Sequence, residues 1–121
     1  MTADSPRDDG LEWALSGGIG ALAEKMGFEW VTFTADRAVA RMPVDGNTQP
    51  VGLFHGGGYV VLGESLGSMH ANFLAGPGRL AVGVDINATH TRSLAVHEIA
   101  VTDDQGRRCS TIRITNMIKD R

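Results

Sequence analysis

The sequence is poor in cysteine, positive charge and long apolar runs, and each shortage excludes a class of protein. Its single cysteine, Cys109, forms no internal disulfide and leaves too few thiolates for a structural zinc or iron-sulfur site. The 11 Lys and Arg residues are outnumbered by 14 Asp and Glu residues, which gives a formal net charge of -3. Such a chain lacks the basic surface that holds nucleic acid or an anionic membrane, so we expect neither as a partner.

No apolar stretch approaches the roughly 18 residues that a membrane-spanning helix needs. The first ten residues carry acidic residues and a proline and lack the apolar segment of a secretory signal. We therefore expect a cytoplasmic protein with a disordered leader at residues 1–10 and one domain at residues 11–121.

Glycine, in contrast, is abundant, with 16 residues. Apolar residues recur at intervals of three and four over residues 11–26, and the glycines between them predict a broken helix. Residues 28–34 and 35–42 are rich in β-formers and predict a hairpin with its turn at residues 34–36.

The best-marked element is a helix predicted over residues 56–74. One of its faces carries a stripe of small residues, namely Gly56, Val60, Gly63, Gly67 and Ala71. Each interior glycine costs about 1 kcal/mol relative to alanine, so we expect the backbone of a sheet or of a partner helix to lie close to this stripe. Residues 79–87, 95–102 and 107–118 predict three more strands, and this order of elements is typical of an α+β architecture.

Candidate catalytic groups gather at the start of this helix. His55 and the glycines after it would leave backbone N–H groups open at the positive end of the helix dipole, where they polarise a carbonyl or hold an oxyanion. Glu64 and Ser68 are four residues apart and share a helix face, so the serine can orient the carboxylate. The pattern indicates acyl chemistry, and a glycine-rich turn with a solvated glutamate is the alternative that these residues leave open.

A longer motif carries a resemblance to a known family. It consists of Gln49, His55-Gly56-Gly57, Glu64 and Ser68. This spacing resembles the active-site motif of hot-dog-fold acyl-CoA thioesterases, in particular their phenylacetate-pathway (PaaI-like) and 4-hydroxybenzoyl-CoA branch. Residues 81–92 are also similar to the strand that follows the helix in that family. The resemblance implies a long central helix wrapped by a mostly antiparallel sheet, an acyl-CoA substrate, and no cofactor or metal.

Carried over by position, the resemblance implies that Glu64 is the catalytic carboxylate, as general base on water or as nucleophile. The Gly56 N–H would polarise the thioester carbonyl, and Gln49 would position the water or the carboxylate. Ser68 would hold Glu64 or the substrate, and His55 would shape the loop at the carbonyl.

Three further residues are candidates for substrate binding, namely Gly57, Asn87 and Arg92. An arginine at position 92 suits the phosphates of coenzyme A.

The spacing on the helix also predicts an oligomer. Gly56 and Glu64 are eight residues apart, which is about 12 Å along a helix and too far for both to reach one thioester carbon. Two subunits must therefore share each site, and we expect a homodimer or a dimer of dimers. One departure from the family stands out: the long strand that the family places after residue 92 is missing from the sequence, which passes almost directly from Ser93 to Ala95.

Two other functions remain open. The segment from Asp85 through Asn87 to His90 resembles the signature of hot-dog enoyl-CoA hydratases, although in that family the signature precedes the central helix. A non-catalytic acyl-CoA-binding module with the same fold is the second alternative, because a fold does not fix a function. Hydrolysis of a panel of thioesters distinguishes the module from an enzyme.

Overall fold

The computed structural model describes residues 10–90, 99–102, 105–106 and 108–120. Residues 1–9 of the predicted leader, Arg92 and the junction at residues 93–95 lie outside this part of the chain. The helices are α1 (Gly10–Ser16), α2 (Ala21–Met26) and α3 (Gly56–Ala75). The strands are β1 (Glu29–Phe33), β2 (Ala38–Arg41), β3 (Arg79–Thr89), β4 (Ile99–Thr102) and β5 (Arg108–Asp120).

The predicted break in the first helix is confirmed, since α1 and α2 are separate helices. Gly18 and Gly20, which lie between them, have φ angles of 74° and 88°. L-residues with side chains rarely adopt this left-handed region. The glycines therefore turn the chain between two short helices and prevent one long helix.

The predicted hairpin is confirmed as the antiparallel pair of β1 and β2. Thr34 closes its turn, because the Thr34 N–H donates to the Arg37 carbonyl at 2.7 Å and the Thr34 hydroxyl oxygen accepts from the Arg37 N–H at 3.1 Å. Both strands are shorter than predicted, since β2 spans four residues and ends at Arg41 before Pro43.

A second sheet contains three antiparallel strands in the order β3, β5, β4. Strand β5 lies in the middle, and β3 pairs with it from Arg79 opposite Asp120 to Thr89 opposite Thr111. A β-bulge interrupts this pairing between Gly83 and Asp85. All three strands fall within the predicted runs to within about two residues, apart from residues 95–98, which are not described.

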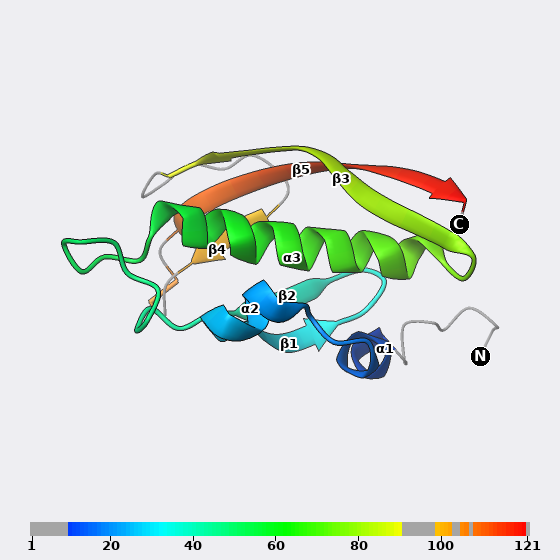
Figure 1. The fold of residues 1–121 in the computed structure, drawn as a ribbon, viewed down its shortest axis with the longest axis horizontal. Helices are drawn as coiled ribbons and strands as arrows, with labels where there is room; N and C mark the ends of the chain where they lie inside the picture. Colours follow the sequence, from blue (N-terminus) through cyan, green and yellow to red (C-terminus); the bar gives the residue numbers. More distant parts are fainter. Residues whose placement is uncertain (1–9, 91–98, 103–104, 107, 121) are drawn as a thin grey trace.

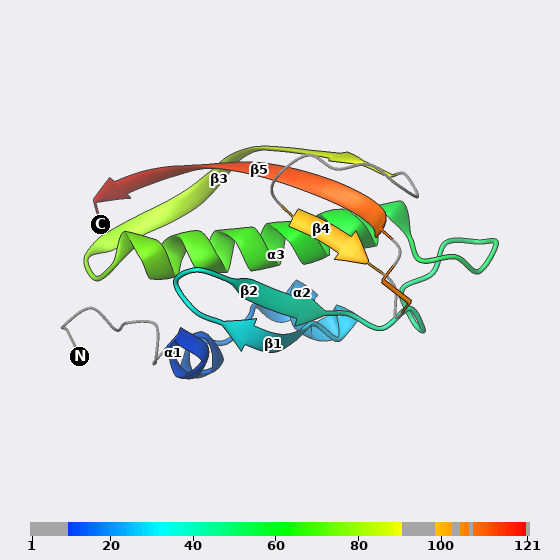
Figure 2. The ribbon, with the colours of Figure 1, turned by 180° about the vertical axis from the view of Figure 1, so that it is seen from behind.

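Helix α3 lies between these two sheets, which confirms the predicted α+β architecture with a central helix. In Figure 1 the strands β3 and β5 lie above α3, β4 lies behind it, and β1, β2, α1 and α2 lie below it. Figure 2 shows the same layers from behind, with β4 and β2 on the near side of the helix. The arrangement makes α3 the element on which both layers pack.

The small-residue stripe on α3 meets the larger sheet through side chains. A Cβ atom at Gly63 would lie 2.7 Å from Cγ2 of Ile112, which belongs to β5 and is fully buried. A Cβ atom at Gly56 would lie 3.2 Å from Nε2 of His90. The expectation of a close backbone is wrong at these two positions: the side chains of Ile112 in β5 and of His90, which follows β3, occupy the room that the glycines leave.

Candidate functional site

The first turn of α3 keeps one backbone donor open. His55 caps the helix, because its Nδ1 accepts a hydrogen bond from the Gly57 N–H at 2.8 Å, and its carbonyl accepts from the Gly58 N–H at 2.8 Å. Within the part of the chain that the structure describes, the Gly56 N–H has no hydrogen-bond partner. A free N–H at the positive end of a 20-residue helix is a donor suited to an oxyanion or a polarised carbonyl.

Aromatic and imidazole rings surround this donor. Tyr59 packs against Phe54 with ring centroids 4.8 Å apart and against His90 with centroids 5.2 Å apart. His90 follows the end of β3 and reaches the start of α3, where its Nε2 lies next to Gly56. In the sequence, His90 belongs to the hydratase-like signature and to the segment that is similar to the family's strand, and no local spacing reveals that β3 carries it to the helix start.

The candidate carboxylate, Glu64, lies two turns further along α3. Ser68 donates its hydroxyl to Oε1 of Glu64 at 2.7 Å, and both residues are half-buried. The same carboxylate faces β3, where a Cβ atom at Gly83 would lie 2.9 Å from Oε1. The pair that was predicted from a spacing of four residues is therefore in contact, against the backbone of the strand.

Asn72 joins α3 to β3 one turn beyond Ser68. Its Nδ2 donates to the Ala81 carbonyl at 3.0 Å, and its Oδ1 accepts from the Ala81 N–H at 2.9 Å. The Nδ2 group also donates to the Ser68 carbonyl at 2.9 Å. The amide thus pairs with Ala81 as a neighbouring strand would, and no spacing in the sequence indicates this role.

Gln49 lies in the loop that leads to α3, and its hydrogen bonds are within that loop. Its Oε1 accepts from the Val51 N–H at 2.6 Å and from the Leu53 N–H at 3.3 Å. Val51 and Leu53 are 77% and 65% exposed, so the loop presents an apolar tip to solvent. Among the described contacts of one protomer, none brings Gln49 to Glu64.

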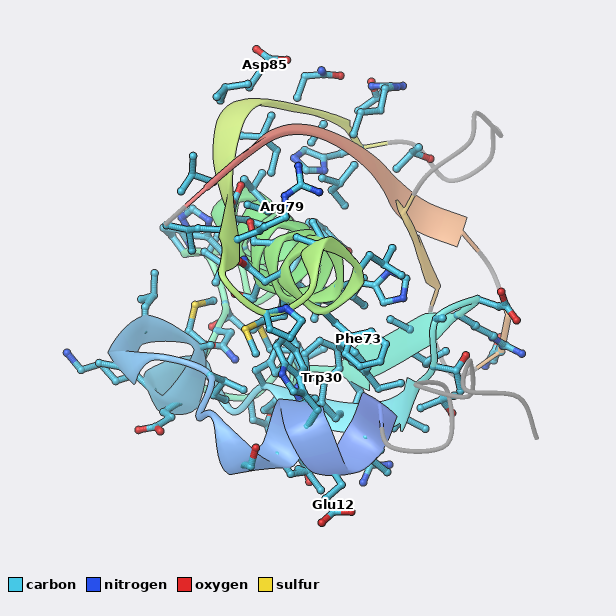
Figure 3. All side chains as sticks on the ribbon, turned by 90° about the vertical axis from the view of Figure 1, so that its right-hand side faces the viewer. Glu12, Trp30, Phe73, Arg79 and Asp85 are labelled. Atoms are coloured by element: carbon cyan, nitrogen blue, oxygen red, sulfur yellow. The ribbon has the colours of Figure 1, made fainter. Side chains whose placement is uncertain are left out.

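Two of the residues predicted to bind substrate, Gly57 and Asn87, are described, and both lie apart from Glu64 within one protomer. Gly57 is the capped residue at the start of α3. Asn87 lies on β3 opposite Arg113, whose Nη1 donates to Oδ1 of Asn87 at 2.6 Å. Asn87 also donates to the carboxylate of Asp85 at 3.5 Å, and Figure 3 shows Asp85 pointing away from α3.

This geometry separates the two groups of the hydratase alternative. Asp85 is on the outer face of the sheet, whereas His90 packs against the start of α3 on the inner side. The two residues are an odd number of positions apart on an extended segment, so their side chains point to opposite faces. One protomer therefore offers no Asp85–His90 acid-base pair.

Neither a metal site nor a membrane-spanning helix is found among the described residues. No group of three or more His, Cys, Asp or Glu side chains in this part of the chain is arranged to hold a metal ion. No described helix has the length and apolar composition needed to cross a membrane.

Known proteins share this arrangement. A family model described as the thioesterase superfamily matches residues 51–114, which run from the loop before α3 into β5. The proofreading thioesterase EntH of Cronobacter turicensis is 36% identical over 119 aligned positions, covering 83% of this chain and 87% of that protein.

Solved thioesterase structures superpose on the chain. One from Haemophilus influenzae has a TM-score of 0.77 at 28% identity, with 91% of this chain and 88% of that chain covered. Another, a variant from Pseudomonas aeruginosa, has a TM-score of 0.78 at 28% identity, with 99% and 96% covered. The chain therefore belongs to the thioesterase superfamily, and it is a thioester hydrolase with the hot-dog fold.

Proposed function

We propose that the protein hydrolyses acyl-CoA thioesters at a site shared by two copies of the chain. In this proposal Glu64 is the catalytic carboxylate, and the Gly56 N–H is the donor to the thioester oxygen. The observation that carries it is a free N–H and a hydrogen-bonded carboxylate on one unbroken helix. This combination supplies an electrophilic and a basic group of the kind that acyl transfer requires.

The separation of these two groups supports a composite site. Eight residues of continuous helix separate Gly56 from Glu64, which is about 12 Å. A carbonyl oxygen and the water that attacks its carbon lie much closer together than that. Each site would therefore combine Glu64 of one copy with Gly56 of the other.

The edge of β3 is a suitable place for the second copy. Among the described strands β3 pairs with β5 alone, so an edge of 11 residues is open. Open edges of this length favour pairing with another chain. An antiparallel pair of β3 strands centred on Asn87 would set His90 of one copy opposite the bulge beside Gly83 of the other. Glu64 lies against Gly83 and Gly56 lies against His90, so this register would bring the two groups together.

The chemistry balances without a cofactor. A water oxygen adds to the thioester carbon while Glu64 takes a proton from that water, and the oxygen that becomes negative accepts from the Gly56 N–H. The carbon–sulfur bond then breaks, and the thiolate leaves with a proton returned by Glu64, giving the free acid and coenzyme A. If Glu64 attacks the carbon directly, an anhydride forms, which water must hydrolyse. A single turnover in H₂¹⁸O that labels Glu64 and leaves the acid unlabelled would show the anhydride route, with water attacking the Glu64 carbonyl carbon.

Replacing Glu64 tests the proposal directly. Glu64→Gln keeps the side-chain volume and removes the basic oxygen, so kcat on the best acyl-CoA should fall by about 10²- to 10⁴-fold with little change in KM. A panel of acyl-CoA thioesters and oxygen esters, assayed with wild type, identifies the substrate class. Activity of Glu64→Gln within a few fold of wild type, with folding and assembly intact, would contradict the role of Glu64.

Replacing Gly56 tests the donor with a matched pair of variants. Proline is tolerated at the first position of a helix, and His55, at φ -62° and ψ 134°, already has the extended backbone that a following proline requires. Gly56→Pro therefore removes the open N–H, and kcat should fall by about 10²- to 10³-fold. Gly56→Ala adds a Cβ atom beside His90 and retains the N–H, so it controls for crowding.

Hybrid dimers test whether the site is shared. If Glu64 and Gly56 act across the interface, a dimer of one Glu64→Gln copy and one Gly56→Pro copy contains one intact site. Co-expression of the two inactive variants should then restore about a quarter of the wild-type activity per chain, because half of the dimers are hybrids. If both groups act within one protomer, the mixture stays inactive.

A further inference from the structure

We propose that Gly83 is a positioning residue, because its missing side chain gives the Glu64 carboxylate the space it occupies beside β3. This inference rests on the proposed function, since it assigns Gly83 a role through Glu64. A Cβ atom at position 83 would lie 2.9 Å from Oε1 of Glu64, 3.5 Å from Oε2 and 3.6 Å from Cδ. The first distance is shorter than carbon and oxygen atoms tolerate without a displacement.

Hydrogen bonds fix the backbone of β3 close to Gly83, so a Cβ atom at position 83 would displace the Glu64 carboxylate and not the strand. Asn72 binds the backbone of Ala81 in both directions, at 3.0 Å to its carbonyl and 2.9 Å from its N–H. Ala81 is buried and lies two residues before Gly83, on the same face of β3. The third Asn72 bond, to the Ser68 carbonyl, anchors the amide to α3 itself. These bonds fix the distance between helix and strand where Gly83 meets Glu64.

The carboxylate itself is held between two contacts. On the helix side Ser68 donates to Oε1 at 2.7 Å, and on the strand side Gly83 faces the same oxygen. A side chain at position 83 would therefore push the oxygen that Ser68 orients. The β-bulge directly after Gly83 reverses which residues of β3 face α3, so Gly83 is the last inward-facing position before the change.

The physical consequence is a variant that stays folded and loses rate. The far end of a glutamate moves by rotation about its side-chain bonds at little cost in folding free energy. Catalysis is less tolerant, because a displacement of a reacting group by about 1 Å can cost 10²-fold in rate. Gly83→Ala should therefore lower kcat by about 10- to 100-fold, change KM by less than about threefold and leave Tm within about 3 °C.

A double-mutant cycle with Glu64→Asp distinguishes an effect of Gly83→Ala on the carboxylate from a non-specific loss of activity. Aspartate is one methylene shorter, so its carboxylate withdraws from β3 and leaves room for the added Cβ atom. If Gly83 acts through the carboxylate, the fold-loss caused by Gly83→Ala should be several times smaller in the Glu64→Asp background than in the wild-type background. Equal fold-losses in both backgrounds would overturn the proposal.

Gly17→Ala is the matched control, because it adds the same methyl group far from Glu64. A Cβ atom at Gly17 would meet only the Trp13 carbonyl oxygen, at 4.0 Å. This variant should retain wild-type kcat within about twofold. A loss of kcat in Gly17→Ala equal to that in Gly83→Ala would contradict a specific role.

A Gly83→Ala protein that fails to fold would overturn the inference, since the backbone rather than the carboxylate would then have carried the strain. Full activity of Glu64→Gln would overturn the proposed function and this inference together. If Glu64→Gln loses activity but Gly83→Ala lowers kcat by the same factor with Glu64 and with Glu64→Asp, this inference alone would be overturned.

Discussion

Glu64 illustrates what can be predicted for a single residue. Its hydrogen bond with Ser68 follows from a separation of four positions in a helix, so the amino-acid spacing is enough to predict the contact. Its contact with Gly83 depends on how β3 crosses α3, and no local pattern encodes that crossing. The same reason explains why Asn72 and the position of His90 could not be foreseen.

The Ser68 hydroxyl should matter for rate more than for substrate affinity. Hydrogen bonds to charged groups contribute about 1.5–3 kcal/mol, and Ser68 is half-buried in contact with Oε1 of Glu64. Ser68→Ala should therefore lower kcat by about tenfold, a smaller loss than that of Glu64→Gln. Steady-state kinetics of both variants measure this order. A rise in KM with unchanged kcat would indicate that Ser68 binds the substrate instead.

Gln49 stabilises the loop before α3, and the sequence motif did not reveal this role. The resemblance assigns it to the water or the carboxylate, whereas its Oε1 accepts from the N–H groups of Val51 and Leu53 in this structure. The Nε2 group has no hydrogen bond within the described residues, so the same side chain can brace the loop and still donate to a substrate or a partner. Its predicted role remains a prediction.

Among the elements, α3 was the most predictable, because its apolar spacing and its glycine-rich start agree. Its limits differ from the predicted ones by one residue at the end. The first turn depends on a feature that the sequence suggests less clearly, namely the His55 imidazole that caps the Gly57 N–H. Histidine is not among the residues most favoured at this position.

The His55 cap should contribute to stability. Loss of a helix N-cap costs about 1 kcal/mol, so His55→Ala should lower the free energy of unfolding by this amount. His55→Asn retains an acceptor that can reach the same N–H, and it should keep most of the stability. Urea denaturation of the two variants measures the difference. Equal destabilisation by both would show that the ring contributes through packing and not through the cap.

The three hydrogen bonds of the Asn72 amide, which we call the Asn72 clamp, should influence both the stability of the fold and kcat. Asn72→Asp keeps the acceptor for the Ala81 N–H and loses the donors to the Ala81 and Ser68 carbonyls, so we expect a loss of about 1–3 kcal/mol in stability and a lower kcat. Asn47→Asp is a matched change, because Asn47 donates to the Met26 and Pro43 carbonyls at 2.7 and 2.8 Å.

The comparison of these two asparagines isolates the effect on Glu64. Both variants lose two donated bonds, so both should be destabilised to a similar degree when urea denaturation is measured. The loss of kcat should be greater for Asn72→Asp, since Asn72 alone of the two binds β3 beside Gly83. Equal losses of kcat would show that the clamp has no specific influence on the carboxylate.

For the whole molecule, the strand that the sequence predicts to be missing after residue 92 stays a prediction, because the junction at residues 93–95 lies outside the described part of the chain. In the described structure the strands form two sheets, with β2 paired to β1 and β4 paired to β5. Sequence patterns predicted each strand, but the division into two sheets follows from which strands lie side by side.

The register of the proposed dimer gives a last prediction. In an antiparallel β3 pair centred on Asn87, this residue lies opposite itself, with Cα atoms close enough for a disulfide. Asn87→Cys, with Cys109 replaced by serine, should therefore form a covalent dimer on mild oxidation, seen by non-reducing gel electrophoresis. Asp85→Cys is the control: it is exposed on the same outer face, but about 13 Å separates two residues at position 85 in this register. A sedimenting dimer in which Asp85→Cys cross-links as fast as Asn87→Cys would contradict the register and, with it, the convergence of Glu64 and Gly56.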